Sequence, residues 1–141
     1  MARLWHDIIN APVGRTIVYD NVVTNIGLAY DKFTGIFTAP VRGIYEFSFS
    51  ISSSAGFTQG FLVKNGELIL GIYSGIVKNS TWGLASSTVS MHLNKGDRMF
   101  VNEEDSAIAT IHSGNMTYFT GHLIQQKNRT DNDAHLAKTI I

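Results

Sequence analysis

The chain has 141 residues, 44% of them hydrophobic and only 16% charged, and its formal net charge is zero. This length suggests one domain that can bury a core without covalent staples. The basic residues are scattered and cysteine is absent, so the sequence gives no support to nucleic-acid binding and excludes disulfides, thiolate catalysis and cysteine-based zinc sites.

Strands dominate the predicted elements, because the hydrophobic period is two rather than 3.6. In the N-terminal segment, residues 1–14, the stretch LWHDII is ambiguous between a helical turn and an edge strand. An Asn65-Gly66 pair predicts a hairpin, because both residue types accept positive φ. The tail, residues 127–141, is expected to be either disordered or a short helix. The predicted strand regions, in chain order, are Arg15–Val23, Gly43–Ser52, Gly60–Leu70, Ser87–Asn102 and Met116–Gln125.

One strand carries rings at every second position: Tyr45, Phe47 and Phe49. Burying three aromatic side chains stabilises a fold by several kcal/mol. The alternate residues of this strand would normally face water; they are Glu46, Ser48 and Ser50. Two interpretations stay open at this point: an ordinary sandwich core, or strand positions that face a second subunit.

A series of spaced residues runs through the first third of the chain: Tyr19, Asn25, Tyr30, Phe37, Gly43, Tyr45, Phe47 and Phe49. This series resembles the signature of the complement C1q globular domain, with Tyr19 where that family usually has phenylalanine. The resemblance extends from about Ile17 to Gln126 through the stretches VKNGEL, LNKGDRMFV and YFTGHLI.

The resemblance implies an all-β fold: a ten-stranded antiparallel jelly-roll sandwich, similar in architecture to tumour necrosis factor, over residues 15–126. It implies a homotrimer, because members of the family usually assemble around a three-fold axis. It also implies that the signature residues belong to the family core together with three residues of the last strand, Phe119, Gly121 and Leu123.

No metal, cofactor or catalytic site is expected. Several family members hold Ca²⁺ through carboxylates before the last strand, but here Ile111–Phe119 contains no Asp or Glu. The acidic run Glu103-Glu104-Asp105 is more consistent with a solvated turn. Nucleophile elbows, P-loops and paired-histidine zinc motifs are absent. An enzyme is therefore not expected, although a triad assembled only in space stays open.

Ligand recognition is the more favoured activity. The loop-like stretch Gly71–Gly83 carries Tyr73 and Trp82, and aromatic rings suit the C–H face of a sugar. A second group of candidate ligand-binding residues is His112, Asn115 and Tyr118. The alternative is that the rings pack under their own loop or across a subunit contact. Asn79 and Asn128 are candidate glycosylation sites at expected surface positions, whereas the sequon at Asn115 lies close to the implied axis.

These observations predict a secreted, homotrimeric, non-catalytic lectin-like domain that binds carbohydrate or other patterned surfaces in innate immunity, as stand-alone members of this family do. No nucleic-acid partner and no membrane span are expected. The first residues lack the features of a signal peptide, so either the protein is cytosolic or its leader has been removed. The alternative is a structural or signalling trimerisation domain of a matrix or receptor-binding protein.

Overall fold

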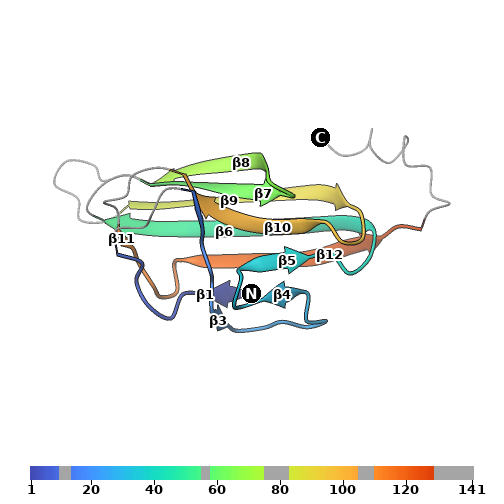
Figure 1. The fold of residues 1–141 in the computed structure, drawn as a ribbon, viewed down its shortest axis with the longest axis horizontal. Helices are drawn as coiled ribbons and strands as arrows, with labels where there is room; N and C mark the ends of the chain where they lie inside the picture. Colours follow the sequence, from blue (N-terminus) through green and yellow to red (C-terminus); the bar gives the residue numbers. More distant parts are fainter. Residues whose placement is uncertain (10–13, 55–57, 75–82, 105–109, 129–141) are drawn as a thin grey trace.

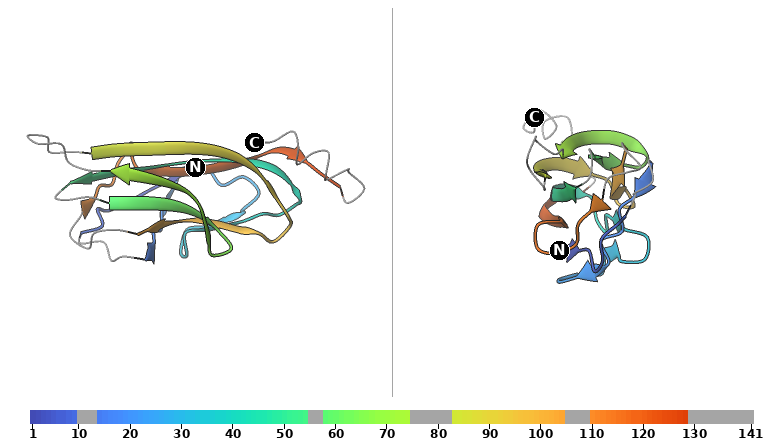
Figure 2. Two further views of the ribbon diagram at one scale, coloured as in Figure 1. Left: turned by 90° about the horizontal axis from the view of Figure 1, so that it is seen from above. Right: turned by 90° about the vertical axis from the view of Figure 1, so that its left-hand side faces the viewer.

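A computed structural model describes residues 1–9, 14–54, 58–74, 83–104 and 110–128 (Figures 1 and 2). These residues form strands and contain no helix. The described part of the chain therefore has no helix that is long and apolar enough to cross a membrane. The strands are β1 (Ala2–Arg3), β2 (Arg15–Thr16), β3 (Asn21–Val22), β4 (Tyr30–Asp31), β5 (Ile36–Thr38), β6 (Gly43–Ser54), β7 (Thr58–Lys64), β8 (Glu67–Ser74), β9 (Gly83–Leu93), β10 (Arg98–Glu103), β11 (Thr110–Ile111) and β12 (Tyr118–Gln126).

The strands pair into two antiparallel sheets. In the first sheet β9 pairs along one edge of β6, and both β11 and β12 pair along its other edge. Next to β12 come β1 and then β3. In the second sheet the order is β4, β5, β10, β7 and β8, with β2 beside β5 along β10. Each sheet thus has five lateral strand positions among the described residues. The predicted all-β antiparallel sandwich is confirmed, although the described residues form twelve strands rather than the ten that were predicted.

The core is built on the alternating rings of β6. Tyr45, Phe47 and Phe49 are at most 1% exposed. Phe47 lies at the centre, with its ring centroid 5.2 Å from Phe37 on β5 and 6.1 Å from Phe119 on β12. Edge-to-face and offset pairs of this kind add to the hydrophobic gain of burial. The first interpretation of the alternation, a sandwich core, therefore accounts for these rings.

The other face of β6 differs from the prediction at its C-terminal half. Glu46 and Ser48 are half-buried, but Ser50 is only 1% exposed. The turn before β12 covers it: the Ser50 hydroxyl donates to the Met116 carbonyl and accepts the backbone N–H of Tyr118. A buried hydroxyl needs such partners. The expectation that Ser50 meets water is wrong.

The N-terminal segment belongs to the first sheet. Ala2 pairs with Phe119 on one side and with Val22 on the other. The ambiguous LWHDII stretch forms no helical turn; its Ile8 makes an isolated antiparallel bridge to Ile111. The Asn65-Gly66 hairpin between β7 and β8 is as predicted, with φ values of 51° and 93°. The expectation of a disordered or short helical tail concerns residues that lie, beyond residue 128, outside the described part of the chain.

A glycine on β12 allows the central ring to pack. A Cβ atom on Gly121 would lie 2.6 Å from Cε1 of Phe47, whose ring is fixed between its neighbours. We expect Gly121→Ala to lower the free energy of unfolding by about 1–3 kcal/mol, as overpacking does. Urea denaturation measures this loss, and Phe47→Leu in the same chain should make the alanine less costly. Thr120→Ala is the neighbouring control, and wild-type stability for Gly121→Ala would contradict the account.

Candidate functional site

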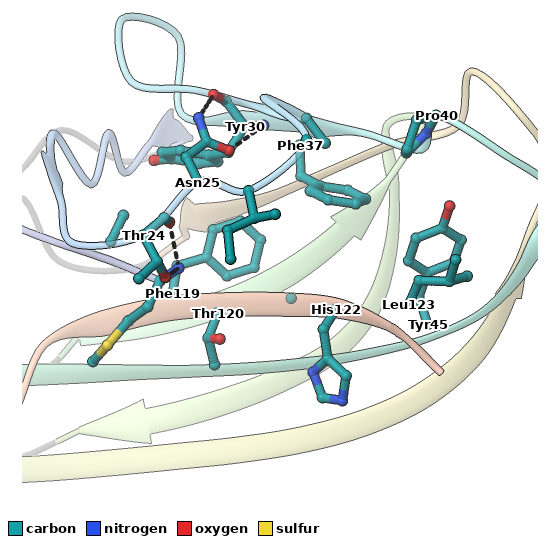
Figure 3. A pocket seen from close by; sticks show the side chains of 16 residues that line it. Thr24, Asn25, Tyr30, Phe37, Pro40, Tyr45, Phe119, Thr120, His122 and Leu123 are labelled. Carbon is teal, nitrogen blue, oxygen red and sulfur yellow. Dashed lines mark hydrogen bonds between the residues drawn. The ribbon is translucent and has the colours of Figure 1, made fainter. Parts of the chain in front are cut away.

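A cavity of about 350 Å³ opens between the loop of residues 24–30 and β12 (Figure 3). Its lining is largely apolar and includes the edges of several core rings. In Figure 3, Phe119 points to the cavity side of β12, whereas Thr120 and His122 point to the opposite side. The lining residues are Met1, Ala2, Thr24, Asn25, Ile26, Gly27, Ala29, Tyr30, Phe37, Pro40, Tyr45, Phe119, Thr120, Gly121, His122 and Leu123.

Asn25 fastens the loop that forms one wall of this cavity. Its Nδ2 donates to the Tyr30 carbonyl at 2.8 Å, and the Tyr30 N–H donates to Asn25 Oδ1 at 3.3 Å. Between them Gly27 and Leu28 take φ values of 85° and 56°, in the left-handed region. A side-chain amide can satisfy backbone groups that such a turn leaves unpaired. Asn25 is therefore a loop-fastening residue rather than a packed core residue.

The phenols around the cavity are neutral donors. Tyr30 donates its hydroxyl to the Tyr19 carbonyl at 2.8 Å, and Tyr45 donates to the Val41 carbonyl at 2.6 Å. Burial raises the pKa of Tyr30, and it also raises the pKa of Tyr45. Desolvation disfavours the charged phenolate. The cavity wall thus offers apolar surface, with the phenol hydroxyls already engaged with backbone carbonyls.

Apolar side chains stand exposed around the mouth of the cavity. Ile26 is 96% exposed and Leu123 is 40% exposed, and both line the cavity; we call these two residues the cavity rim. Leu123 is not a core residue in the single chain, contrary to the expectation. It lines the open cavity at this end of β12, so other side chains do not cover it. The other predicted core rings, including Tyr19, Phe37 and Phe119, are buried, except that Tyr30 is half-buried and packs against the core.

The strand β9, on the other side of β6 from β12, carries a further exposed apolar residue. Leu84, near the start of β9, is 58% exposed. Since β9 pairs only with β6 in its sheet, its other side is an edge. We call this the β9 edge. Exposed apolar side chains therefore lie at two separate places, one at the β9 edge and one at the cavity rim formed by β12 and the β3–β4 loop.

The predicted ligand-binding residues do not form one cluster. Tyr73 lies on β8 in the second sheet and is 52% exposed. Asn115 is exposed and accepts a hydrogen bond from Arg3, and Tyr118 pairs with Arg3 across the β1–β12 ladder. His112 contacts Asp7 and Ser54 instead. Trp82 and Asn79 lie outside the described residues; Asn128 is exposed.

The acidic run after β10 is not a solvated turn throughout. Glu103 is the last residue of β10, is 1% exposed, and accepts a hydrogen bond from the Thr58 hydroxyl at 3.0 Å. Glu104 is half-buried, and Asp105 lies outside the described residues. The interpretation of this run is therefore wrong for Glu103. The described part of the chain contains no group of three or more histidine, cysteine or acidic residues arranged to hold a metal ion.

Comparison with known proteins gives consistent findings. The family model of the C1q domain matches residues 3–124. Complement C1q tumor necrosis factor-related protein 3 of Homo sapiens and that of Mus musculus are each 32% identical over 110 residues. Those residues make up 77% of this chain but 44% of the relative. The chain therefore spans less than half the length of these two curated relatives.

Solved structures share the architecture. The globular domain of a zebrafish complement 1qA protein aligns with a TM-score of 0.66 at 21% identity, over 83% of this chain and 90% of that one. The structure of Eiger TNF from S. frugiperda aligns with a TM-score of 0.62 at 13% identity, over 94% and 99% of the two chains. At these identities the comparison bears on the fold alone, and the jelly-roll prediction is confirmed.

Proposed function

The chain belongs to the C1q domain family, and from this membership we propose that it is a secreted recognition domain that acts as a homotrimer. Its proposed ligands are carbohydrate or other patterned surfaces, in the manner of a lectin of innate immunity. Recognition, rather than catalysis, is the main activity that we assign to it. The observation that carries the proposal is the pair of different exposed apolar groups, one at the β9 edge and one at the cavity rim.

Two different patches favour a ring over a two-fold dimer. In a two-fold dimer one patch meets its own copy, whereas a head-to-tail contact joins two distinct patches. The cavity rim of one copy would take Leu84 from the β9 edge of the next, and three such contacts close the ring. The exposed Ile26, Leu123 and Leu84 would then be covered. This contact also supplies the packing that Leu123 lacks in the single chain.

The closed trimer would present each surface residue three times. Tyr73 is half exposed on a strand paired along its length with β7, so its ring is held by a rigid support. An aromatic face of this kind suits the apolar side of a sugar. Linking weak sites raises apparent affinity by about 10²–10⁴ when the geometry permits simultaneous binding. Repeated glycans on a surface are therefore the proposed ligand.

A glycan array probed with wild-type trimer and with a monomeric variant tests this function. We expect binding by the trimer to particular glycans or microbial polysaccharides, and a much weaker signal from the monomer. Tyr73→Ala should reduce the signal at least about tenfold, the scale of one lost stacking contact, while remaining trimeric. Phe33→Ala is the matched control, because Phe33 is an 82% exposed ring away from the proposed contacts. A flat array for the trimer contradicts carbohydrate binding.

A second function is favoured by the names of the relatives, which call them tumor necrosis factor-related. In that case the domain is the trimerisation unit of a structural or signalling protein. Both functions share the same fold and trimer. A trimer that binds no glycan but binds a protein receptor through its outer loops would favour the second.

A further inference from the structure

Three residues that are remote in sequence meet at one end of the sandwich. Ser54 ends β6, His112 follows β11, and Asp7 precedes the Ile8–Ile111 bridge. Backbone pairing holds two of them and the neighbour of the third: Ser54 lies opposite Thr110, the His112 N–H donates to the Ser52 carbonyl at 2.8 Å, and Ile8 next to Asp7 pairs with Ile111. Their positions therefore follow from strand pairing and not from side-chain contact alone.

The three side chains are linked by two contacts. Ser54 Oγ lies 2.5 Å from His112 Nε2, and His112 Nδ1 lies 3.3 Å from Asp7 Oδ2. This is the order of a serine nucleophile, an imidazole base and a carboxylate that orients it. The same order recurs on unrelated folds, and it is recognised by geometry rather than by sequence position. No short motif would have revealed it.

Asp7 is held in the form that such a role needs. Its Oδ1 accepts the backbone N–H of Ser113 at 2.7 Å and the Ser113 hydroxyl at 2.9 Å. These hydrogen bonds, with a smaller contribution from nearby His112, lower the pKa of Asp7. Its Oδ2 faces His112 Nδ1, which favours the tautomer with the proton on Nδ1. The lone pair of Nε2 then faces Ser54 Oγ.

Ser54 is more exposed to solvent than its neighbour Ser53. Ser53 is 0% exposed and shares a hydrogen bond with the buried Ser74 hydroxyl. Ser54 is half-buried, and the side chains of His112 and Asp7 are 16% and 41% exposed. A small molecule can approach this group from solvent. A half-buried hydroxyl favours a small acyl group over a bulky one.

We propose that Ser54 is an activated nucleophile that reacts with small acyl esters. Its oxygen bonds to the carbonyl carbon, its proton passes to His112 Nε2, and the ester oxygen departs with that proton as an alcohol. Water then attacks the acyl-serine, His112 takes its proton, and the acid is released as the proton returns to Ser54. Asp7 is a positioning residue that acts through His112.

A fluorophosphonate probe and p-nitrophenyl acetate test the proposal on the folded chain. We expect one covalent adduct by intact mass, located at Ser54 by peptide mapping, and slow release of p-nitrophenol. Ser54→Ala should abolish both signals. His112→Gln should slow labelling at least about 100-fold, the usual contribution of a positioned base. Ser86→Ala removes an exposed hydroxyl on β9 and should label as wild type.

The positioning role of Asp7 is tested by rescue. Asp7→Ala should slow labelling, and Asp7→Glu should restore part of the rate, with thermal unfolding measured for every variant. A purely structural Asp7 would change the melting temperature without this rescue. Absence of an adduct on folded wild-type protein overturns the proposal, and so does an adduct on Ser54 that forms equally fast in a folded His112→Gln variant.

Discussion

Phe47→Ala is expected to lower the free energy of unfolding by about 3–5 kcal/mol, the usual range for a phenylalanine removed from a core. Phe47 is 0% exposed and lies between the rings of Phe37, Tyr45 and Phe119. Its loss removes buried apolar surface and leaves a cavity that its rigid neighbours cannot fill. Since small domains are stable by only about 5–15 kcal/mol, much of the chain should unfold on mild heating.

Chemical denaturation followed by tryptophan fluorescence and circular dichroism measures this effect. The matched control is Phe33→Ala, which removes the same side chain from an 82% exposed position. That variant should stay within about 0.5 kcal/mol of wild type, as most surface changes do. Equal losses for the two variants would mean that the packed rings of β6 are not the main source of stability.

Leu123→Asp is expected to convert the proposed trimer into folded monomer at micromolar concentration. Leu123 is 40% exposed in the single chain, so a carboxylate there meets water in a monomer. In the ring it would be buried against the next copy without a partner, which costs several kcal/mol at each contact. Leu84→Asp at the β9 edge should have the same effect, since it lies on the other side of each contact.

Sedimentation velocity and circular dichroism distinguish dissociation from unfolding in these variants. A mixture of the Leu123 and Leu84 variants retains one intact pair of patches, so it should form dimers but no closed ring. Phe33→Asp introduces the same charge at an exposed site outside both patches and should remain trimeric. A Leu123→Asp variant that stays trimeric would contradict the assignment of the cavity rim to the contact.

The sandwich could be predicted from sequence because alternation reports directly which face of a strand is buried. The rings of Tyr45, Phe47 and Phe49 fall on one face of any extended chain, and Asn65-Gly66 specifies a hairpin through its positive φ angles. Both signals are local. The spaced signature from Tyr19 to Phe49 then identified the family, which carries the strand order that local patterns do not contain.

The same alternation could not predict which strand residues are covered by segments that are remote in the sequence. Leu123 falls on the same face of β12 as Phe119 but lines an open cavity. The alternation of a strand shows which face a residue is on, but not which segment packs against that face. Ser50 has the pattern of a solvent-facing residue, yet the turn before β12 covers it. Glu103 is buried beside Thr58 for a similar reason.

The arrangement of Asp7, Ser54 and His112 is a further case. These residues have no motif spacing, and only the pairing of β6 with β11 and the Ile8 bridge bring them together. The predicted ligand group of His112, Asn115 and Tyr118 rests on their closeness in sequence. In the fold His112 turns to Ser54 while Asn115 meets Arg3. Side-chain direction after a short strand depends on tertiary contacts.

Sedimentation equilibrium of the wild-type chain across micromolar dilution most directly tests the central claim. This claim is that the apolar side chains of the cavity rim and the β9 edge are buried when three copies assemble. The account predicts a single species of three times the 15.5 kDa chain mass. A well-behaved species of one chain mass at the same concentrations would contradict it.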